Sequence, residues 1–192
     1  MYYDQGRYED AIHEYQQAAD LSPKWAAPLS NLGKAHWLIG DYPAAITNYQ
    51  KAIQISPDQY KCNSLGWLYI VTEDYEQAEV TLQKALEDVD WASLFNYGLL
   101  QALQSSWEQA QVTWHKGYEL CQVDDDWPQA ASTFYQVVLG EAEQGIHNLK
   151  RLLDQDQISS DFKQMLLLVA QVMQRCPQLS ESAQQLEALL LE

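Results

Sequence analysis

Residues 26–57 read AAPLSNLGKAHWLIGDYPAAITNYQKAIQISP and predict two short amphipathic helices joined by a tight turn. Apolar and small residues recur three and four positions apart, so each helix has one face that can pack. We expect the first helix at about residues 28–39 and the second from residue 42 or 43 to residue 55. Gly40 can adopt the left-handed conformation that ends a helix, and Asp41 is a favourable N-cap for the next one. One such hairpin cannot bury its apolar face alone, so it requires neighbours.

The same pattern occurs earlier in the chain at a fixed distance. The matched residues are Gly6 and Gly40, Tyr8 and Tyr42, Ala11 and Ala45, Ile12 and Ile46, Tyr15 and Tyr49, Ala18 and Ala52, and Pro23 and Pro57, each pair 34 residues apart. A related motif follows, with Leu65-Gly66, Tyr69, Tyr75, Ala78 and Ala85, and in it Glu73 takes the place of the turn glycine. A fixed period of this length is typical of repeat arrays. On these residues, and on Leu32-Gly33, the chain resembles the tetratricopeptide repeat (TPR) family.

The resemblance implies an all-α fold, a right-handed α-solenoid of helix-turn-helix hairpins with a C-terminal capping helix. We expect about five and a half repeats in a single solenoid over residues 1–192. The expected units are a truncated repeat at 1–25, repeats at 26–58, 59–90 and 91–122, a degenerate repeat at 123–156, and a degenerate helix pair with the cap at 157–192. The steps between equivalent small residues are 33 from Ala45 to Ala78, 32 from Ala78 to Ala110, and 35 from Ala110 to Gly145.

The first repeat is incomplete, because Met1 falls inside its first helix. An incomplete repeat leaves apolar surface that a neighbour or a cap would otherwise cover. We therefore expect the chain to be a piece of a longer protein. Its complete second helix, at residues 8–21, should still pack against residues 26–39.

The net charge of −16, from 27 acidic and 11 basic residues, restricts the kinds of partner. It opposes binding to nucleic acid or to anionic membranes, which depends on Lys and Arg neutralising phosphates. It allows a basic partner, although a solvated acidic surface explains the same composition. No apolar run reaches the roughly 18 residues of a membrane span, and we see no pattern typical of a secretion signal. Three widely spaced cysteines suggest neither a disulfide framework nor a zinc site, so we expect a cytoplasmic location.

No catalytic signature is present in the sequence, and we expect neither enzymatic activity nor a cofactor. The segment Gly33-Lys34-Ala35 lacks the upstream glycine and the hydroxyl residue of a phosphate-binding loop. The four histidines are far apart, and no two of them have the spacing of metal ligands. Cys62 is a nucleophile in principle, but a buried structural thiol is the alternative that we favour.

The resemblance implies that the first helices of successive repeats line a groove for a peptide or a helix of a partner protein. The groove residues expected here are Asn31, Lys34, Trp37, Asn63, Trp67, Phe95, Asn96, Leu99 and Phe134. An aromatic series within this set, suited to anchoring apolar side chains, consists of Trp37, Trp67, Phe95 and Phe134. Asn31 and Asn96 match a position at which, in some family members, asparagine hydrogen-bonds the ligand backbone. The alternative is that the aromatic residues pack between helices.

We therefore predict a non-enzymatic scaffold or adaptor that binds a protein or peptide partner of basic or apolar character. Binding to acidic chaperone tails is disfavoured, because Lys34 is the only basic residue among the aligned groove positions. Two alternatives stay open. One is a regulatory or sensor domain of a larger enzyme, an ATPase or a protease, whose catalytic part precedes Met1. The other is self-assembly through the incomplete first repeat.

Overall fold

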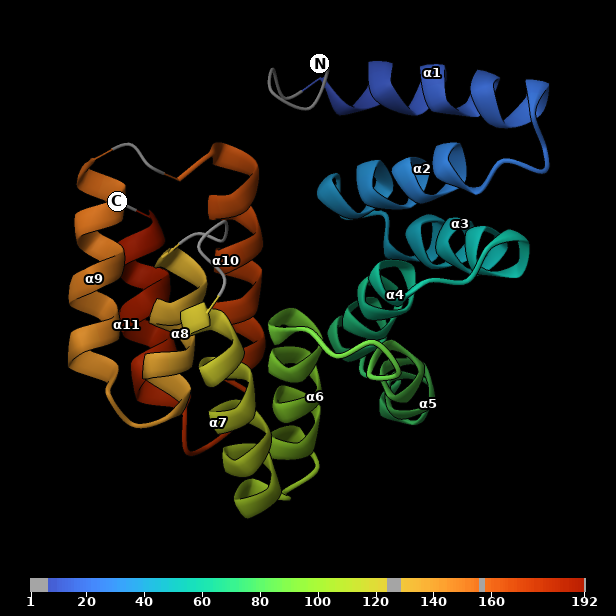
Figure 1. Cartoon of the computed structure of the whole chain (residues 1–192). Coiled ribbons are helices and arrows are strands. Elements are labelled where there is room, and N and C mark those ends of the chain that lie inside the picture. The colour runs from blue at the N-terminus through green and yellow to red at the C-terminus, as the bar shows by residue number, and fades with distance from the viewer. Residues whose placement is uncertain (1–6, 124–128, 156–157, 192) are drawn as a thin grey trace. The chain divides into compact units, whose positions relative to one another are not determined.

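The computed structural model describes residues 7–123, 129–155 and 158–191, and in these ranges it contains eleven α-helices and no strand (Figure 1). The helices are α1 (Tyr8–Leu21), α2 (Ala26–Leu38), α3 (Tyr42–Ile55), α4 (Gln59–Val71), α5 (Tyr75–Ala85), α6 (Trp91–Leu103), α7 (Trp107–Val123), α8 (Gln129–Val138), α9 (Ala142–Asp154), α10 (Ser160–Met173) and α11 (Ser180–Leu191). One single helix thus precedes five helix pairs. The all-α prediction of about five and a half repeats is confirmed.

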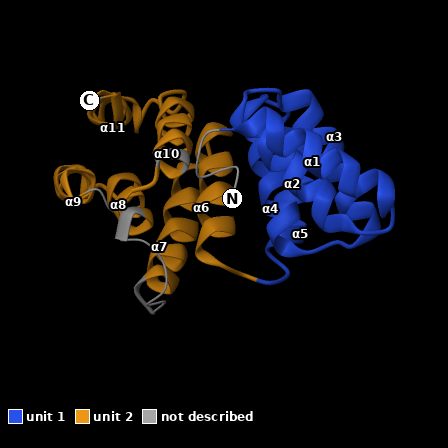
Figure 2. Cartoon of the chain, turned by 90° about the horizontal axis from the view of Figure 1, so that it is seen from above, with its two compact units in different colours: residues 1–88 blue, residues 89–192 orange. Residues whose placement is uncertain are grey.

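Each pair forms a hairpin whose two helices pack against each other, from α2 with α3 to α10 with α11. Packing between hairpins joins α1 to α2, α3 to α4, and α7 to α8. The chain divides into two compact units, residues 1–88 with α1 to α5 and residues 89–192 with α6 to α11 (Figure 2). The division falls two residues before the boundary expected between the third and fourth repeats. That all the repeats form a single solenoid stays a prediction.

The expected helix boundaries are close to those of the structure. Helix α3 begins at Tyr42 and ends at Ile55, as predicted, whereas α2 begins two residues before the predicted Pro28. Ser159 caps α10, because its Oγ accepts a hydrogen bond from the Phe162 N–H at 3.3 Å. The three consecutive aspartates at residues 124–126, which the sequence suggests form a loop that caps the next helix, lie outside the described residues.

The turn inside each of the first four hairpins places one residue in the left-handed region. These residues are Gly40 (φ 78°), Glu73 (φ 64°), Ser105 (φ 64°) and Gly140 (φ 95°), which follow one another at the steps of 33, 32 and 35 residues found in the sequence. After each of them, the next residue's N–H donates to a carbonyl five positions earlier, as Asp41 does to His36 and Asp74 to Tyr69, both at 2.9 Å. This arrangement ends a helix and frees the chain to start the next one. Glu73 therefore performs the role of the turn glycine, at a conformational cost.

An aspartate occupies the N-cap position of four consecutive helices, α3 to α6. The side chains of Asp41, Asp58, Asp74 and Asp90 accept hydrogen bonds from the N–H three residues later, at 3.2, 2.8, 3.2 and 2.7 Å. Each bond satisfies a donor that the helix itself leaves unpaired, and a carboxylate at this end also meets the positive end of the helix dipole. The N-cap predicted at Asp41 is confirmed, and the sequence position of each aspartate explains where its helix starts.

A glycine on the first helix lets the two helices of a hairpin touch. A methyl group added at Gly33 would lie 2.7 Å from the Tyr49 ring, and one added at Gly66 would lie 2.5 Å from Cγ of Leu82. Gly98 has the same relation to Trp114, whose Nε1 donates to the Phe95 carbonyl at 3.1 Å. In these three hairpins the bulky side chain lies 16 residues after its glycine. This close approach is the contact expected from the small residue Gly33.

Replacing Glu73 by glycine should stabilise the protein. The left-handed conformation costs an L-residue roughly 1 kcal/mol, and glycine avoids that cost while losing some of the gain through its freer unfolded chain. We expect Glu73→Gly to raise the free energy of unfolding, measured in urea, by about 0.5 kcal/mol. Glu76→Gly, at an exposed position of α5, is the matched control and should lower it. A loss of stability in Glu73→Gly as large as in the control would contradict the role assigned to this turn.

Replacing Gly66 by alanine should destabilise the protein, because the new methyl group collides with Leu82. We expect a loss of about 1–3 kcal/mol in the free energy of unfolding. In the double variant Gly66→Ala/Leu82→Ala the collision is absent. The double variant should therefore lose less stability than the sum of the losses measured for Gly66→Ala and Leu82→Ala alone. Strictly additive losses would show that the two helices do not depend on this contact.

Candidate partner-binding surface

Four of the five first helices of the hairpins differ in charge from the rest of the chain. Helices α2, α4, α6 and α8 contain no aspartate or glutamate, and their only lysines are Lys34 and Lys61. Among the described residues, the acidic side chains lie instead on the other helices and in the connecting segments. A protein with a net charge of −16 therefore keeps one set of helices free of negative side chains. Such a surface does not repel carboxylates or peptide carbonyl groups.

In the first unit, the structure places four predicted groove residues where they are partly accessible. Asn31, Lys34 and Trp37 on α2 and Asn63 on α4 are half-buried. Trp67, the fifth, is 6% exposed, and its Nε1 is buried without a hydrogen-bond partner among the described residues. The accessible part of this set is thus mainly polar, and it consists of groups that can hydrogen-bond a peptide backbone.

In the second unit, most of the predicted groove residues belong to the core. Phe95, Leu99 and Phe134 are 7%, 0% and 3% exposed, while Asn96 is half-buried. The Phe95 ring meets the Phe134 ring edge-on at a centroid distance of 6.3 Å and the Tyr135 ring at 5.3 Å. The Tyr135 hydroxyl donates to the Trp91 carbonyl. These side chains are buried because α8 turns its aromatic side chains toward α6, in agreement with the alternative that the aromatic residues pack between helices.

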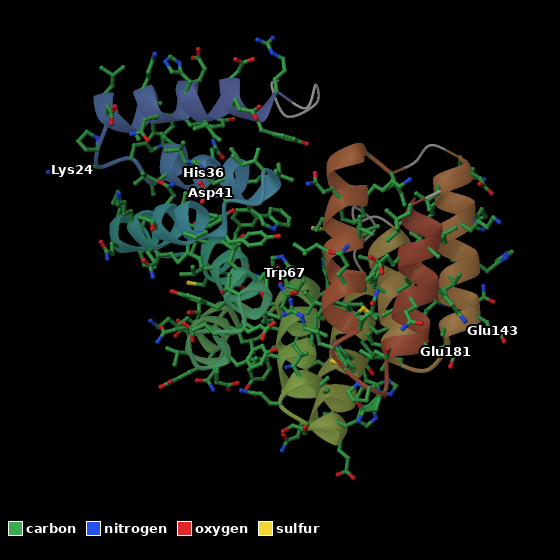
Figure 3. All side chains as sticks on the ribbon, turned by 180° about the vertical axis from the view of Figure 1, so that it is seen from behind. Lys24, His36, Asp41, Trp67, Glu143 and Glu181 are labelled. Carbon is green, nitrogen blue, oxygen red and sulfur yellow. The ribbon has the colours of Figure 1, made fainter. Side chains whose placement is uncertain are left out.

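A pocket of about 460 Å³ opens at the N-terminal ends of α2 and α4, and we call it the N-end pocket. Its walls include Lys24 and Trp25 from the segment before α2, Ile55 from the end of α3, and Tyr60 and Lys61 from the start of α4. The predicted groove residue Asn31 also lines it. Lys24 lies on the connector between α1 and α2 (Figure 3).

Sequence reasoning missed the contribution of Lys24 and Trp25. The signal was present, because Trp25 is a large aromatic residue just outside the helical repeat pattern. Periodicity describes the packed faces of helices and gives no information on the connecting segments. The contribution of the connecting segments to the pocket could therefore be found only in the structure.

The ionisable groups offer little for catalysis. Burial raises the pKa of the Cys62 thiol, so the prediction of a buried structural thiol is confirmed. His36 Nδ1 lies 3.5 Å from the carboxylate of Asp41, near the turn of the second repeat (Figure 3). Within the part of the chain that the structure describes, no three His, Cys, Asp or Glu residues come together as metal ligands could. None of the described helices has the length and apolar character needed to cross a membrane.

These features define an α-helical repeat protein whose surface is of the kind that contacts other proteins. Family models described as "TPR repeat" and "Tetratricopeptide repeat" match residues 1–40, 26–59 and 62–87. The chain is thus a tetratricopeptide repeat protein. The matched repeats fill most of the first unit.

Two relatives share parts of the chain. Human tetratricopeptide repeat protein 21B is 37% identical over 78 residues, which are 41% of this chain and 6% of that protein. BBSome complex member BBS4 of Bos taurus is 29% identical over 83 residues, 43% of this chain and 16% of that one. The chain thus corresponds to a small part of the length of either relative.

Solved structures share the fold at low sequence identity. A tetratricopeptide repeat protein from Parabacteroides merdae superposes with a TM-score of 0.62 at 15% identity, over 100% of this chain and 80% of that one. YrrB, described as a TPR protein with an unusual peptide-binding site, superposes with a TM-score of 0.52 at 16% identity, over 92% of this chain and 95% of that one. At such identity the likeness establishes the helix-hairpin fold alone.

The three thiols should differ in reactivity. Cys121 is half-buried, whereas Cys62 and Cys176 are buried, and burial raises the pKa of Cys176 to about 11. A thiolate is the reactive form, so at pH 8 iodoacetamide should modify Cys121 in the folded protein and the other two only after unfolding. Mass spectrometry of proteolytic peptides shows the order in which the three cysteines are modified. In Cys121→Ser the fast modification should be absent, and fast labelling of Cys176 in the folded protein would contradict its burial.

Proposed function

We propose that the protein is a non-enzymatic interaction module that holds a segment of a partner protein against α2 and α4. The observation that carries this proposal is the absence of acidic residues on these two helices in a chain of net charge −16. Acidic side chains are common on solvent-exposed helices, so a surface that lacks them in so acidic a chain has a composition suited to contact.

The partly accessible side chains of this surface fit an extended peptide. Asn31 and Asn63 each carry an amide, which can donate to a backbone carbonyl and accept from a backbone N–H. Trp37 offers part of an aromatic ring to an apolar side chain. Together they provide orientation by hydrogen bonds and affinity by apolar contact, the combination found in peptide grooves.

The relatives support a role in protein assembly. BBS4 is described as a member of a complex, and YrrB as having a peptide-binding site. The family likeness to BBS4 covers 43% of this chain. From these proteins we infer for this chain only the general role of binding another polypeptide. The identity of the partner and the cytoplasmic location stay predictions. So do a role as a regulatory domain of a larger enzyme and self-assembly.

Removing the two amides should weaken capture of the partner. The double variant Asn31→Ala/Asn63→Ala loses up to two hydrogen bonds at about 1 kcal/mol each, so we expect roughly tenfold less partner in affinity capture from a native extract. Quantitative mass spectrometry compares the proteins captured by each variant. The matched control is Gln16→Ala/Gln54→Ala, which changes exposed amides on α1 and α3.

The folded state of every variant is checked by circular dichroism and thermal unfolding. If the captured proteins and their amounts are the same for the double variant and the control, the surface of α2 and α4 is not the binding surface. A partner lost only in the control would place the site on the second helices instead.

A further inference from the structure

The N-end pocket has a composition that differs from the remainder of the first unit. It is formed where two helices begin, α2 at Ala26 and α4 at Gln59, and where α3 ends at Ile55. A volume of about 460 Å³ lies within the range of small-ligand sites, and it accommodates one or two side chains of a partner. The pocket is contiguous with the proposed surface, because Asn31 lines the pocket and is also one of the residues of that surface.

The walls of the pocket expose unusually large apolar side chains. Trp25 is 57% exposed and Tyr60 is 58% exposed, and Ile55 is also exposed. All three line the same pocket. Exposed aromatic residues gathered at a concave site are typical of the anchor points of protein interfaces. An apolar side chain of a partner would remove this surface from water.

The charge of the pocket is positive, in contrast to the net charge of the chain. Asp58 is the acidic residue in the lining, and its carboxylate is already engaged by the Lys61 backbone N–H at 2.8 Å and by the Lys61 ammonium group. Lys24 has no carboxylate within 4.0 Å among the described residues. Two lysines against one aspartate leave one positive charge in the lining.

The helix ends add to this positive field. The N-terminal ends of α2 and α4 carry partial positive charge, while the end of α3 carries the opposite sign. Trp25 occupies the N-cap position of α2 and provides no side-chain hydrogen bond, unlike Asp58 at the start of α4. The cavity, the exposed aromatic rings and the unpaired lysine are therefore complementary to a group that is both acidic and apolar.

We propose that the N-end pocket binds a peptide segment in which an aspartate or glutamate side chain neighbours an aromatic or large aliphatic residue. The carboxylate meets Lys24 at the rim, and the apolar side chain lies between Trp25 and Tyr60. This inference rests on the proposed function and adds the chemistry of the partner to it. It also reverses the sequence-based expectation of a basic partner at this end of the surface.

The test is a selection of peptides on the full chain. A bead-displayed library of random nonapeptides with amidated C-termini excludes recognition of a terminal carboxylate. We expect the selected peptides to share an acidic residue beside an aromatic or aliphatic one. Selection of basic sequences, which Asp58 and the aromatic rings would favour, or of no sequence at all, would overturn the inference.

Variants then locate the binding of one selected peptide, measured by fluorescence anisotropy. Lys24→Ala should weaken binding about fivefold and reduce its dependence on salt. Trp25→Ala and Tyr60→Ala should each weaken it by about tenfold. Lys51→Ala, an exposed lysine of α3 outside the pocket, is the matched control and should bind as the wild type does. Equal losses in Lys24→Ala and Lys51→Ala would overturn the inference.

Two further outcomes separate this inference from the proposed function. If Asn63→Ala, which lies outside the pocket, impairs capture of the native partner while Lys24→Ala and Trp25→Ala do not, the proposed function stands and the inference fails. If none of the three variants impairs capture, both fail. Sedimentation that shows a dimer dissociated by Trp25→Ala would mean that a second copy of the chain occupies the pocket, which also overturns the inference.

Discussion

The contact between a glycine on the first helix and a bulky side chain 16 residues later is the constraint on which three of the five hairpins depend, α2/α3, α4/α5 and α6/α7. At Gly33, Gly66 and Gly98 the two helices are so close that even a methyl group would collide with the facing residue. The turns of the hairpins serve this contact, because a left-handed residue and a following cap return the chain at the required distance. Where glycine is absent from the turn, at Glu73 and Ser105, the same geometry is kept at a conformational cost. Packing of the helix pair therefore outweighs the local preference of the turn residue.

Close packing within the hairpins has a consequence for function. The second helices meet their partners through Tyr49, Leu82 and Trp114, so the first helices have another side left for contacts beyond the hairpin. In the first unit this side carries partly accessible amides and a lysine, and no acidic residue lies on α2 or α4. The acidic residues keep the remaining surface well hydrated. Separation of charge by helix is thus the property on which the proposed contact surface rests.

The candidate site could be predicted from the sequence only in part. Alignment to the repeat placed Asn31, Lys34, Trp37 and Asn63 on the first helices, and the structure leaves these residues partly accessible. The same alignment could not show that Phe95 and Phe134 face each other across α6 and α8. A repeat pattern assigns a side chain to one face of a helix, but the elements that cover the face come from elsewhere in the chain. Lys24 and Trp25 were missed for a related reason, since the pocket joins the connector before α2 to the end of α3 and the start of α4.

The sequence by itself determined the helix-hairpin repeat, its period and the places where helices begin and end. These properties depend on local chemistry, namely the aspartate caps, the turn residues and the spacing of small residues, as at Asp41, Gly40 and Gly33. Only the tertiary structure decided which aromatic residues are buried and which line a pocket. Burial depends on contacts between residues far apart in the chain, and Phe95 is buried while Trp25 is exposed because packing partners reach only the first of them.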